Sequence, residues 1–399
     1  MRRPTAVLTR DDAPLTGVSP SPFGMTAADL VKPLPSRALV HAALIATQVI
    51  FGAGAVVGKL GLPAFNPLVF AAIREGLAGP LLAAAAVATT GLGPSAARPH
   101  WRRFAFLAAT IYLNQGCMIV GLKLSSAVVG SVWQPSIPVF TSLIAVSLGW
   151  EPPSGRRLGG IAVAFASCAA LVACSAAEEN DGGGGANASL GRMLAGNCLF
   201  FVNCLATALY VLGSKPLLTA RDGALPALCV TAWSYCLASV LMVLTAAGFG
   251  ASAALSSFIC ADCERGAWHV PPGARWALAY WVVFQSCVSY ALMTWGNKHA
   301  SASLVSGYAV LQPVTSAALT ELVVLAGLYA RCDRADDDDC LAPVGAADLW
   351  ALGIFLGLYF VITSEPPPPD ALAPLDGDAG ADDGEEKDVR LLLNAESPT

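Results

Sequence analysis

Long apolar segments recur along most of the chain and constrain its fold more than any other feature. Each is long enough to cross about 30 Å of hydrocarbon at a rise of about 1.5 Å per residue. Lipid offers no hydrogen bonds to an exposed backbone, and these segments lack the alternation of a strand, so each is predicted to be an α-helix. The predicted fold is an all-α membrane protein with ten transmembrane helices, at 38–60, 67–90, 103–121, 125–149, 157–175, 193–213, 225–248, 276–296, 302–328 and 346–364.

Composition supports the same fold class. Hydrophobic residues make up 55% of the chain and charged residues only 13%, whereas soluble domains carry about 25% charged residues. Much of the acid is confined to two runs outside the apolar segments, at 336–339 and 382–388. No basic patch suggests a nucleic acid as a partner.

The stretch 101–139 recurs without a gap 175 residues later, at 276–314. The shared core has the form G-x-K-x-x-S-A, followed by Ser and then Pro-Val. Such duplication of an apolar unit is typical of carriers built from two structural repeats. Nine of the 39 paired positions are identical, namely Trp101/Trp276, Met118/Met293, Gly121/Gly296, Lys123/Lys298, Ser126/Ser301, Ala127/Ala302, Ser131/Ser306, Pro138/Pro313 and Val139/Val314.

Each predicted half contains five spans, and an odd number inserts the second half upside down relative to the first. The sequence therefore predicts two inverted five-helix repeats. A modest excess of Lys and Arg in the loops on the N-terminal side predicts that both termini are cytosolic. The expected organisation is a disordered cytosolic tail (1–37), a first repeat (38–176), an acidic and Gly-rich external linker (177–192), a second repeat (193–364) and a disordered acidic cytosolic tail (365–399).

Two features of the loops agree with this orientation. Asn187 begins a glycosylation sequon in the predicted external linker. The four cysteines outside the predicted spans also fall in external loops, where disulfides can form; a zinc site and free thiols are the alternatives. These cysteines are Cys260, Cys263, Cys332 and Cys340.

Several motifs resemble a known family of carriers. The stretch from Pro138 to Glu151 resembles the helix of EamA-type carriers that ends in a proline-to-glutamate signature. Residues 112–127 are similar to a hairpin of the plant "walls are thin" and nodulin-like group, in which an Asn-Gln pair precedes G-x-K-x-x-S-A. The resemblance covers about 38–364 and implies a member of the drug/metabolite transporter superfamily. The second half departs from it, because Ala326 stands where the first half has Glu151.

Polar side chains within the apolar spans are candidates for a solute site, because polar groups at membrane depth are costly. Hydrogen bonding between packed helices is the alternative for any single amide. Arg74 is the favoured partner for a substrate carboxylate, with an internal salt bridge or bonding to helix-end carbonyls as alternatives. The full set of candidate substrate-binding residues is Arg74, Gln48, Asn114, Gln115, Trp133, Gln134, Asn203, Tyr210, Tyr235, Gln285, Tyr290, Tyr308 and Gln312.

Other residues are assigned to movement and coupling. Glu321 and Glu75 are candidates for a proton-coupling site, since a carboxylate held in lipid can load and release a proton. Arg74 and Glu75 are adjacent and should point about 100° apart, so we expect that they do not share a partner well. The prolines that interrupt the fourth and ninth spans are predicted hinges, namely Pro135, Pro138 and Pro313.

The sequence thus predicts a multi-pass carrier of the plasma membrane or of an endomembrane such as the vacuole or Golgi. It would move an amino acid or another small carboxylate-bearing solute by alternating access, with a proton as a candidate coupling ion. The alternatives are a nucleotide-sugar or phosphate-ester antiporter, a channel, and a non-transporting scaffold or receptor. No enzymatic motif, metal site or cofactor is expected. The expected partners are the solute and the lipid bilayer, and a homodimer is left open.

Overall fold

The computed structural model describes residues 35–61, 65–124, 130, 133–150, 154–180, 186–220, 223–250, 268–328 and 349–364. Every regular element in this part of the chain is helical. Seven helical segments there are long and apolar enough to cross a membrane, judged by length and composition. The all-α membrane class predicted from the sequence is therefore confirmed, whereas the count of ten spans and the inversion of the repeats stay predictions.

The helices fall where apolar segments were expected. Several predicted spans contain more than one helical element, and the eighth includes a π-helix, η5. The elements are α1 (Arg37–Gly61), α2 (Pro67–Thr90), η2 (Pro94–Ala96), η3 (Arg98–His100), α3 (Trp101–Leu124), α5 (Ser136–Ser147), α6 (Gly155–Asn180), α7 (Ala186–Thr219), α8 (Ala227–Gly250), η4 (Pro272–Ala274), α10 (Arg275–Tyr280), η5 (Trp281–Val288), α11 (Ser289–His299), α12 (Ala302–Gly307), η6 (Tyr308–Val310), α13 (Leu311–Leu325) and α14 (Ala351–Ile362).

Some regions predicted from the sequence lie wholly or partly outside the described residues. Most of both terminal tails and the external cysteines Cys260, Cys263, Cys332 and Cys340 are among them. Helices extend into both ends of the expected linker (177–192), because α6 continues to Asn180 and α7 begins at Ala186. Asn187 therefore lies in the first turn of α7, and its side chain is outside the described part.

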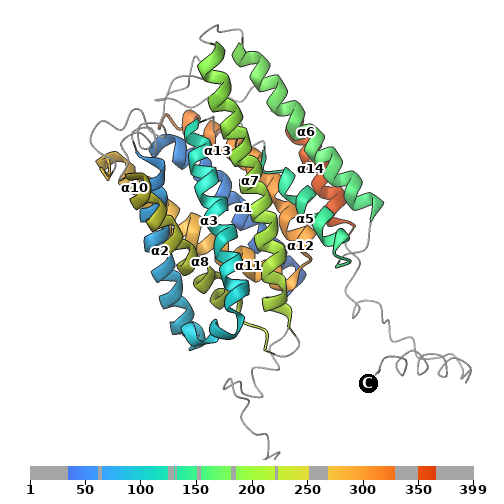
Figure 1. Cartoon of the computed structure of the whole chain (residues 1–399). Helices are drawn as coiled ribbons and strands as arrows, with labels where there is room; N and C mark the ends of the chain where they lie inside the picture. Colours follow the sequence, from blue (N-terminus) through green and yellow to red (C-terminus); the bar gives the residue numbers. More distant parts are fainter. Residues whose placement is uncertain are drawn as a thin grey trace, which may run out of the picture.

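Helices from the two halves of the chain pack directly against each other. Helix α2 packs on α8, α3 on α7, and α1 on α13 and α11. Helices α6 and α14 lie side by side at one edge of the bundle (Figure 1). Their backbones approach closely because both contribute glycine: a Cβ on Gly160 would lie 2.7 Å from the carbonyl oxygen of Gly357.

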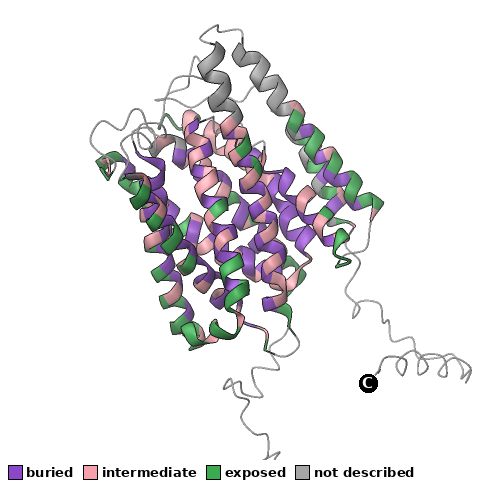
Figure 2. Ribbon diagram, in the orientation of Figure 1, coloured by how far each residue is buried: buried purple, intermediate pink, exposed green. Residues whose placement is uncertain are grey.

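The exterior of the bundle is strongly apolar, while polar groups are buried inside. Large hydrophobic side chains point outward, such as Leu81 on α2 and Leu244 on α8. Figure 2 shows exposed residues along the outer faces of these helices and buried residues where helices meet. Arg74 and Glu75, in contrast, are completely enclosed. This distribution is what a lipid-facing surface requires and is unusual for a protein in water.

Helix α2, which carries Arg74 and Glu75, has well-defined ends. At its start the Asn66 side chain accepts hydrogen bonds from the backbone N–H groups of Leu68 (3.0 Å) and Val69 (3.3 Å), and Pro67 takes the first helical position, where no N–H is needed. It ends at Gly91, whose φ of 68° is in the left-handed region that favours glycine.

Candidate functional site

Arg74 is the centre of a buried polar network. Its Nε donates to Ser286 Oγ on η5 at 2.8 Å, and its Nη2 donates to Gln115 Oε1 on α3. The guanidinium also lies over the Trp281 ring, 4.8 Å from the ring centroid. One arginine on α2 therefore binds both α3 and the π-helix η5, which belong to different halves of the chain.

Glu75 forms an ion pair with its neighbour, since Arg74 Nη2 lies 3.1 Å from Glu75 Oε1. The Tyr235 hydroxyl donates to the same carboxylate oxygen at 3.1 Å and accepts from Arg74 Nη2 at 3.5 Å. The expectation that Arg74 and Glu75 would not share a partner is therefore wrong. Helix α8 packs on α2, and its Tyr235 hydroxyl contacts both side chains.

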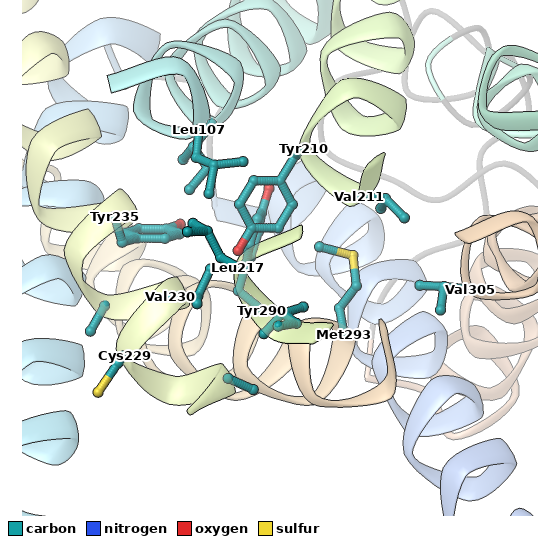
Figure 3. Close-up of a cluster of buried hydrophobic side chains, with 14 of the residues drawn as sticks. Leu107, Tyr210, Val211, Leu217, Cys229, Val230, Tyr235, Tyr290, Met293 and Val305 are labelled. Atoms are coloured by element: carbon teal, nitrogen blue, oxygen red, sulfur yellow. The ribbon is translucent and has the colours of Figure 1, made fainter. Parts of the chain in front are cut away.

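The network continues from α3 through a tyrosine on α11. Gln115 Nε2 donates to the Tyr290 hydroxyl, and that hydroxyl donates to Asn114 Oδ1 at 2.7 Å. The Tyr235 and Tyr210 rings both pack edge-on against the Tyr290 ring, at centroid distances of 5.2 and 5.7 Å. Figure 3 shows these three tyrosines, from α7, α8 and α11, within one buried cluster.

Helix α7 contributes two further residues to this network, Asn203 and Tyr210. Asn203 Nδ2 donates to the Asn114 carbonyl at 2.8 Å, and Asn203 Oδ1 accepts from Gln134 Nε2 at 3.2 Å. The Tyr210 hydroxyl is hydrogen-bonded to Thr294 Oγ1 at 2.9 Å. These amides and hydroxyls join packed helices, which is the structural alternative that the sequence left open for each of them.

Buried polar atoms without a hydrogen-bond partner are most frequent on α2, which carries Arg74, and around the π-helix η5. Of seven such atoms found in the described residues, five come from α2, η5 and the first residue of α11. Buried polar groups are normally satisfied, so this concentration calls for an explanation. The five atoms are Arg74 Nη1, Glu75 Oε2, Trp281 Nε1, Gln285 Oε1 and Ser289 Oγ.

The π-helix was not predicted from the sequence. It carries Trp281 and Ser286, both of which contact Arg74. Serine and tryptophan are ordinary residues of apolar helices, so their types gave no signal. Single-turn π-segments often mark functional sites, because they shift side chains out of the α-helical register.

Two further candidates lie on the seam between α1 and α13. Gln312 Nε2 donates to Gln48 Oε1 at 2.8 Å. One turn earlier, the Tyr308 hydroxyl is hydrogen-bonded to Nδ1 of His41, also on α1, at 2.6 Å. Tyr308 and Gln312, four residues apart, therefore both bind α1. His41 was missed because it is a lone histidine near a span end.

Trp133 is the counterpart of Tyr308 in the first half of the chain. Its Nε1 donates to Asn197 Oδ1 on α7 at 2.8 Å. Trp133 and Tyr308 are paired positions of the repeat, and each binds the helix that begins the other half. The structure places Trp133 in a small cluster with Cys204 and Ile137, whereas Tyr308 belongs to the main core.

The helices that carry these two aromatics are interrupted at matched positions. The chain turns at Gln134 and Pro135 before α5 begins at Ser136. Helix α12 ends at Gly307, and a 3₁₀ turn, η6, precedes the start of α13 at Leu311. Ser136 and Leu311 are paired positions of the repeat. Of the predicted hinges, Pro135 lies at the first break, while Pro138 and Pro313 lie in the first turn of the helix that follows each break.

The remaining candidates lie elsewhere. Gln285 is on η5, and its side chain rests on Gly54 of α1. Glu321 is half-buried on α13. Within the described residues, no group of three or more His, Cys, Asp and Glu side chains could hold a metal ion.

The fold and the apolar exterior define this chain as a multi-pass integral membrane protein. Residues 39–173 match the EamA-like transporter family, whose members are transporters of the drug/metabolite transporter superfamily. The resemblance to EamA-type carriers is thereby confirmed over the first half of the chain. The likeness to the plant group stays a prediction.

A solved crystal structure of a protein shares this fold. The similarity covers 82% of this chain and 98% of that chain, with a TM-score of 0.60 and 17% sequence identity. At this identity the likeness concerns the fold alone. It extends well beyond the part of the chain that matches the family.

Proposed function

We propose that the protein is a carrier that moves a small zwitterionic or carboxylate-bearing solute, such as an amino acid, by alternating access. The unpartnered atoms around Arg74 carry this proposal. Arg74 Nη1 is a donor and Glu75 Oε2 an acceptor on two side chains that are already bridged through their other atoms. A solute with a carboxylate and an ammonium group would satisfy both.

The packing of the helices supports two halves related by a two-fold axis. Counted along the chain, α7, α8 and α10–α11 of the second half correspond to α1, α2 and α3 of the first. Helix α3 packs on α7, as α11 packs on α1; α5 packs on α7, as α13 packs on α1. Each contact thus recurs with the halves exchanged.

Contacts between equivalent positions support the same axis. Gln115 and Tyr290 are paired positions of the repeat, and they are hydrogen-bonded to each other. Glu75 and Tyr235 stand at the same place in the 24-residue helices α2 and α8, and they too are hydrogen-bonded. The Arg74 network therefore lies where the two halves meet, which is where carriers with inverted repeats bind solutes.

The direction of the helices favours inversion over a parallel duplication. Figure 1 shows the turn between α2 and α3 at one end of the bundle and the start of α10 at the opposite end. Helix α3 and the run α10–η5–α11, which are equivalent in the repeat, consequently point in opposite directions. A pseudo-two-fold axis in the membrane plane accounts for this arrangement.

Coupling to protons is assigned to Glu75 in this proposal, with Glu321 as the alternative. Glu75 belongs to the network and pairs with Arg74. Protonation of Glu75 would neutralise its carboxylate and break that ion pair. Arg74 would then be available to bind the solute carboxylate. Glu321, on α13, is only half-buried. Gradient-driven uptake that is abolished by Glu75→Gln and retained by Glu321→Gln is the expected pattern.

The rival functions are weaker. A phosphate-ester antiporter would need several cationic side chains around its substrate. Within the described residues the network contains one such side chain, that of Arg74. A scaffold would use all its polar groups between helices. That is true of Asn203 and Gln134, but not of the unpartnered atoms near Arg74.

Uptake by proteoliposomes tests the proposal. Purified protein is reconstituted, offered a mixed pool of metabolites, and the accumulated solutes are identified by mass spectrometry. The informative variant is Arg74→Gln with Glu75→Gln, because it removes both charges and leaves neither one buried alone. We expect its uptake of the identified solute to fall roughly 10- to 100-fold, the equivalent of lost charge-assisted hydrogen bonds.

Tyr112→Phe is the matched control. It removes a hydrogen bond of 2.8 Å that joins α3 to Thr245 of α8 and is not one of the hydrogen bonds of the Arg74 network, and it should leave uptake unchanged. A folded double variant that transports at the wild-type rate would overturn the site. Wild-type liposomes that accumulate no more solute than empty ones would overturn the carrier and favour the scaffold.

A further inference from the structure

The turn between α2 and α3 gathers positive charge around an exposed tryptophan. Arg98, Arg102 and Arg103 are all exposed, and none forms an ion pair with a carboxylate in the described chain. Trp101 is 63% exposed, and the Arg102 guanidinium lies over its ring, 5.5 Å from the centroid. A pocket of about 450 Å³ is lined by Pro99, His100, Trp101, Arg102 and Arg103.

The stability of the fold does not account for these cations. Arg102 and Arg103 stand in the first turn of α3. Positive charge is unfavourable there, because the N-terminal end of a helix is itself partially positive. Both side chains are exposed, and the contact of Arg102 with the exposed Trp101 ring leaves its charge uncompensated. Their positions are better explained by a negatively charged partner.

The repeat supplies an internal comparison. Trp276 is the counterpart of Trp101 and is similarly exposed, at 51%. The residues that follow it are Ala277 and Leu278, however, where the first half has two arginines. Exposed tryptophans at both places are explained by the aromatic belts at the two membrane–water interfaces. The pair of arginines that follows the tryptophan stands at the turn predicted to face the cytosol, whereas the other turn has a single arginine, Arg275, before its tryptophan.

We propose that this pocket binds the headgroup of an anionic phospholipid in the leaflet on the N-terminal side. Trp101 would lie at headgroup level, and the arginine forks of Arg102 and Arg103 would hold the lipid phosphate, which suits planar guanidinium groups. Anionic lipids concentrate in the cytosolic leaflet, which agrees with the predicted orientation. This site is separate from the Arg74 network and does not rest on the proposed function.

Native mass spectrometry of the full-length protein in a mild detergent tests the site. Phosphatidylserine is titrated in, and phosphatidylcholine with the same acyl chains serves as the neutral comparison. Each cation near a membrane surface contributes about 1 kcal/mol to binding an anionic lipid. Arg102→Gln with Arg103→Gln should therefore weaken the first phosphatidylserine bound by roughly 25-fold. The substituted side chains are exposed, so the variant should melt like the wild type.

Arg275→Gln is the control, because it removes the arginine beside Trp276. It should change phosphatidylserine binding less than about twofold, against about fivefold per cation in the pocket. Equal binding of phosphatidylserine by the double variant and the wild type would overturn the proposal, as would equal binding of phosphatidylcholine. Displacement of the lipid by millimolar inorganic phosphate would assign the pocket to a soluble anion instead.

Discussion

The hydroxyl of Tyr290 links the two halves of the chain at the level of single atoms. It accepts from Gln115 and donates to Asn114, and the side chain is almost fully buried. Removing it would leave the Gln115 amide and the Asn114 oxygen without these partners. Unpaired buried polar groups cost more than the mean contribution of a hydrogen bond, so Tyr290 is a sensitive position.

Tyr290→Phe is therefore predicted to lower the free energy of unfolding by about 1–3 kcal/mol. Thermal denaturation of the purified protein in detergent measures the effect. Tyr359→Phe is the control, since Tyr359 is 57% exposed on α14, and it should change stability by less than about 0.5 kcal/mol. Equal melting temperatures for the two variants would mean that the Tyr290 hydroxyl contributes nothing to the contact between the halves.

Sequence reasoning identified most side chains of the network but not how they combine. Arg74, Asn114, Gln115, Tyr235 and Tyr290 were each predicted from polarity within an apolar span, and the structure brings them together. The ion pair and the shared tyrosine depend on how α2 crosses α8, which no local pattern encodes. Whether the network binds a solute remains a prediction.

At the scale of helices, two hydrogen bonds connect the interrupted segments to the helices that begin each half. Trp133 binds α7, and Tyr308 binds α1. Under alternating access each bond should hold one end of the carrier closed. The accessibility of the native Cys204 thiol can be used to detect opening of the end that Trp133 holds closed. This thiol is completely buried, and its Sγ lies 3.2 Å from the Trp133 carbonyl oxygen.

Trp133→Phe removes the indole donor and should open the end at which Cys204 is buried. Labelling of Cys204 by a membrane-impermeant maleimide, located by peptide mass spectrometry, should then accelerate roughly fivefold, as expected for about 1 kcal/mol lost with one hydrogen bond. Tyr308→Phe, the repeat counterpart, should not accelerate it. Equal acceleration by both variants would indicate general loosening of the fold and contradict separate gates.

Helices α6 and α14 depend on glycine for their contact. A side chain on Gly357 would meet the Gly160 carbonyl and Ala164 of α6. Gly357→Leu should force the helices apart and lower the free energy of unfolding by about 1–3 kcal/mol, as overpacking does. Leu356→Ala, at an exposed neighbouring position, is the control for thermal denaturation. A Gly357→Leu protein as stable as this control would show that the close contact is dispensable.

At the scale of the whole molecule, the sequence predicted the helices better than their exact shapes. Apolar length located the helical segments, because lipid permits little other backbone structure. The 3₁₀ turn at Tyr308 and the π-helix at Trp281–Val288 were not foreseen, since they arise from packing between helices that are far apart in sequence. The matched breaks were foreseen only as proline hinges.

The orientation of the two repeats can be decided from outside the membrane. The turns before α3 and before α10 precede equivalent helices, yet inversion puts them on opposite faces. Single cysteines at Ser95 and Gly273, both exposed, are introduced into a chain in which the native cysteines are replaced by serine or alanine. In intact cells an impermeant maleimide should label the Gly273→Cys protein, and the Ser95→Cys protein should react only after permeabilisation. If both cysteines react from the same side, the halves run parallel. The shared site at Arg74 would then lack the symmetry that alternating access requires.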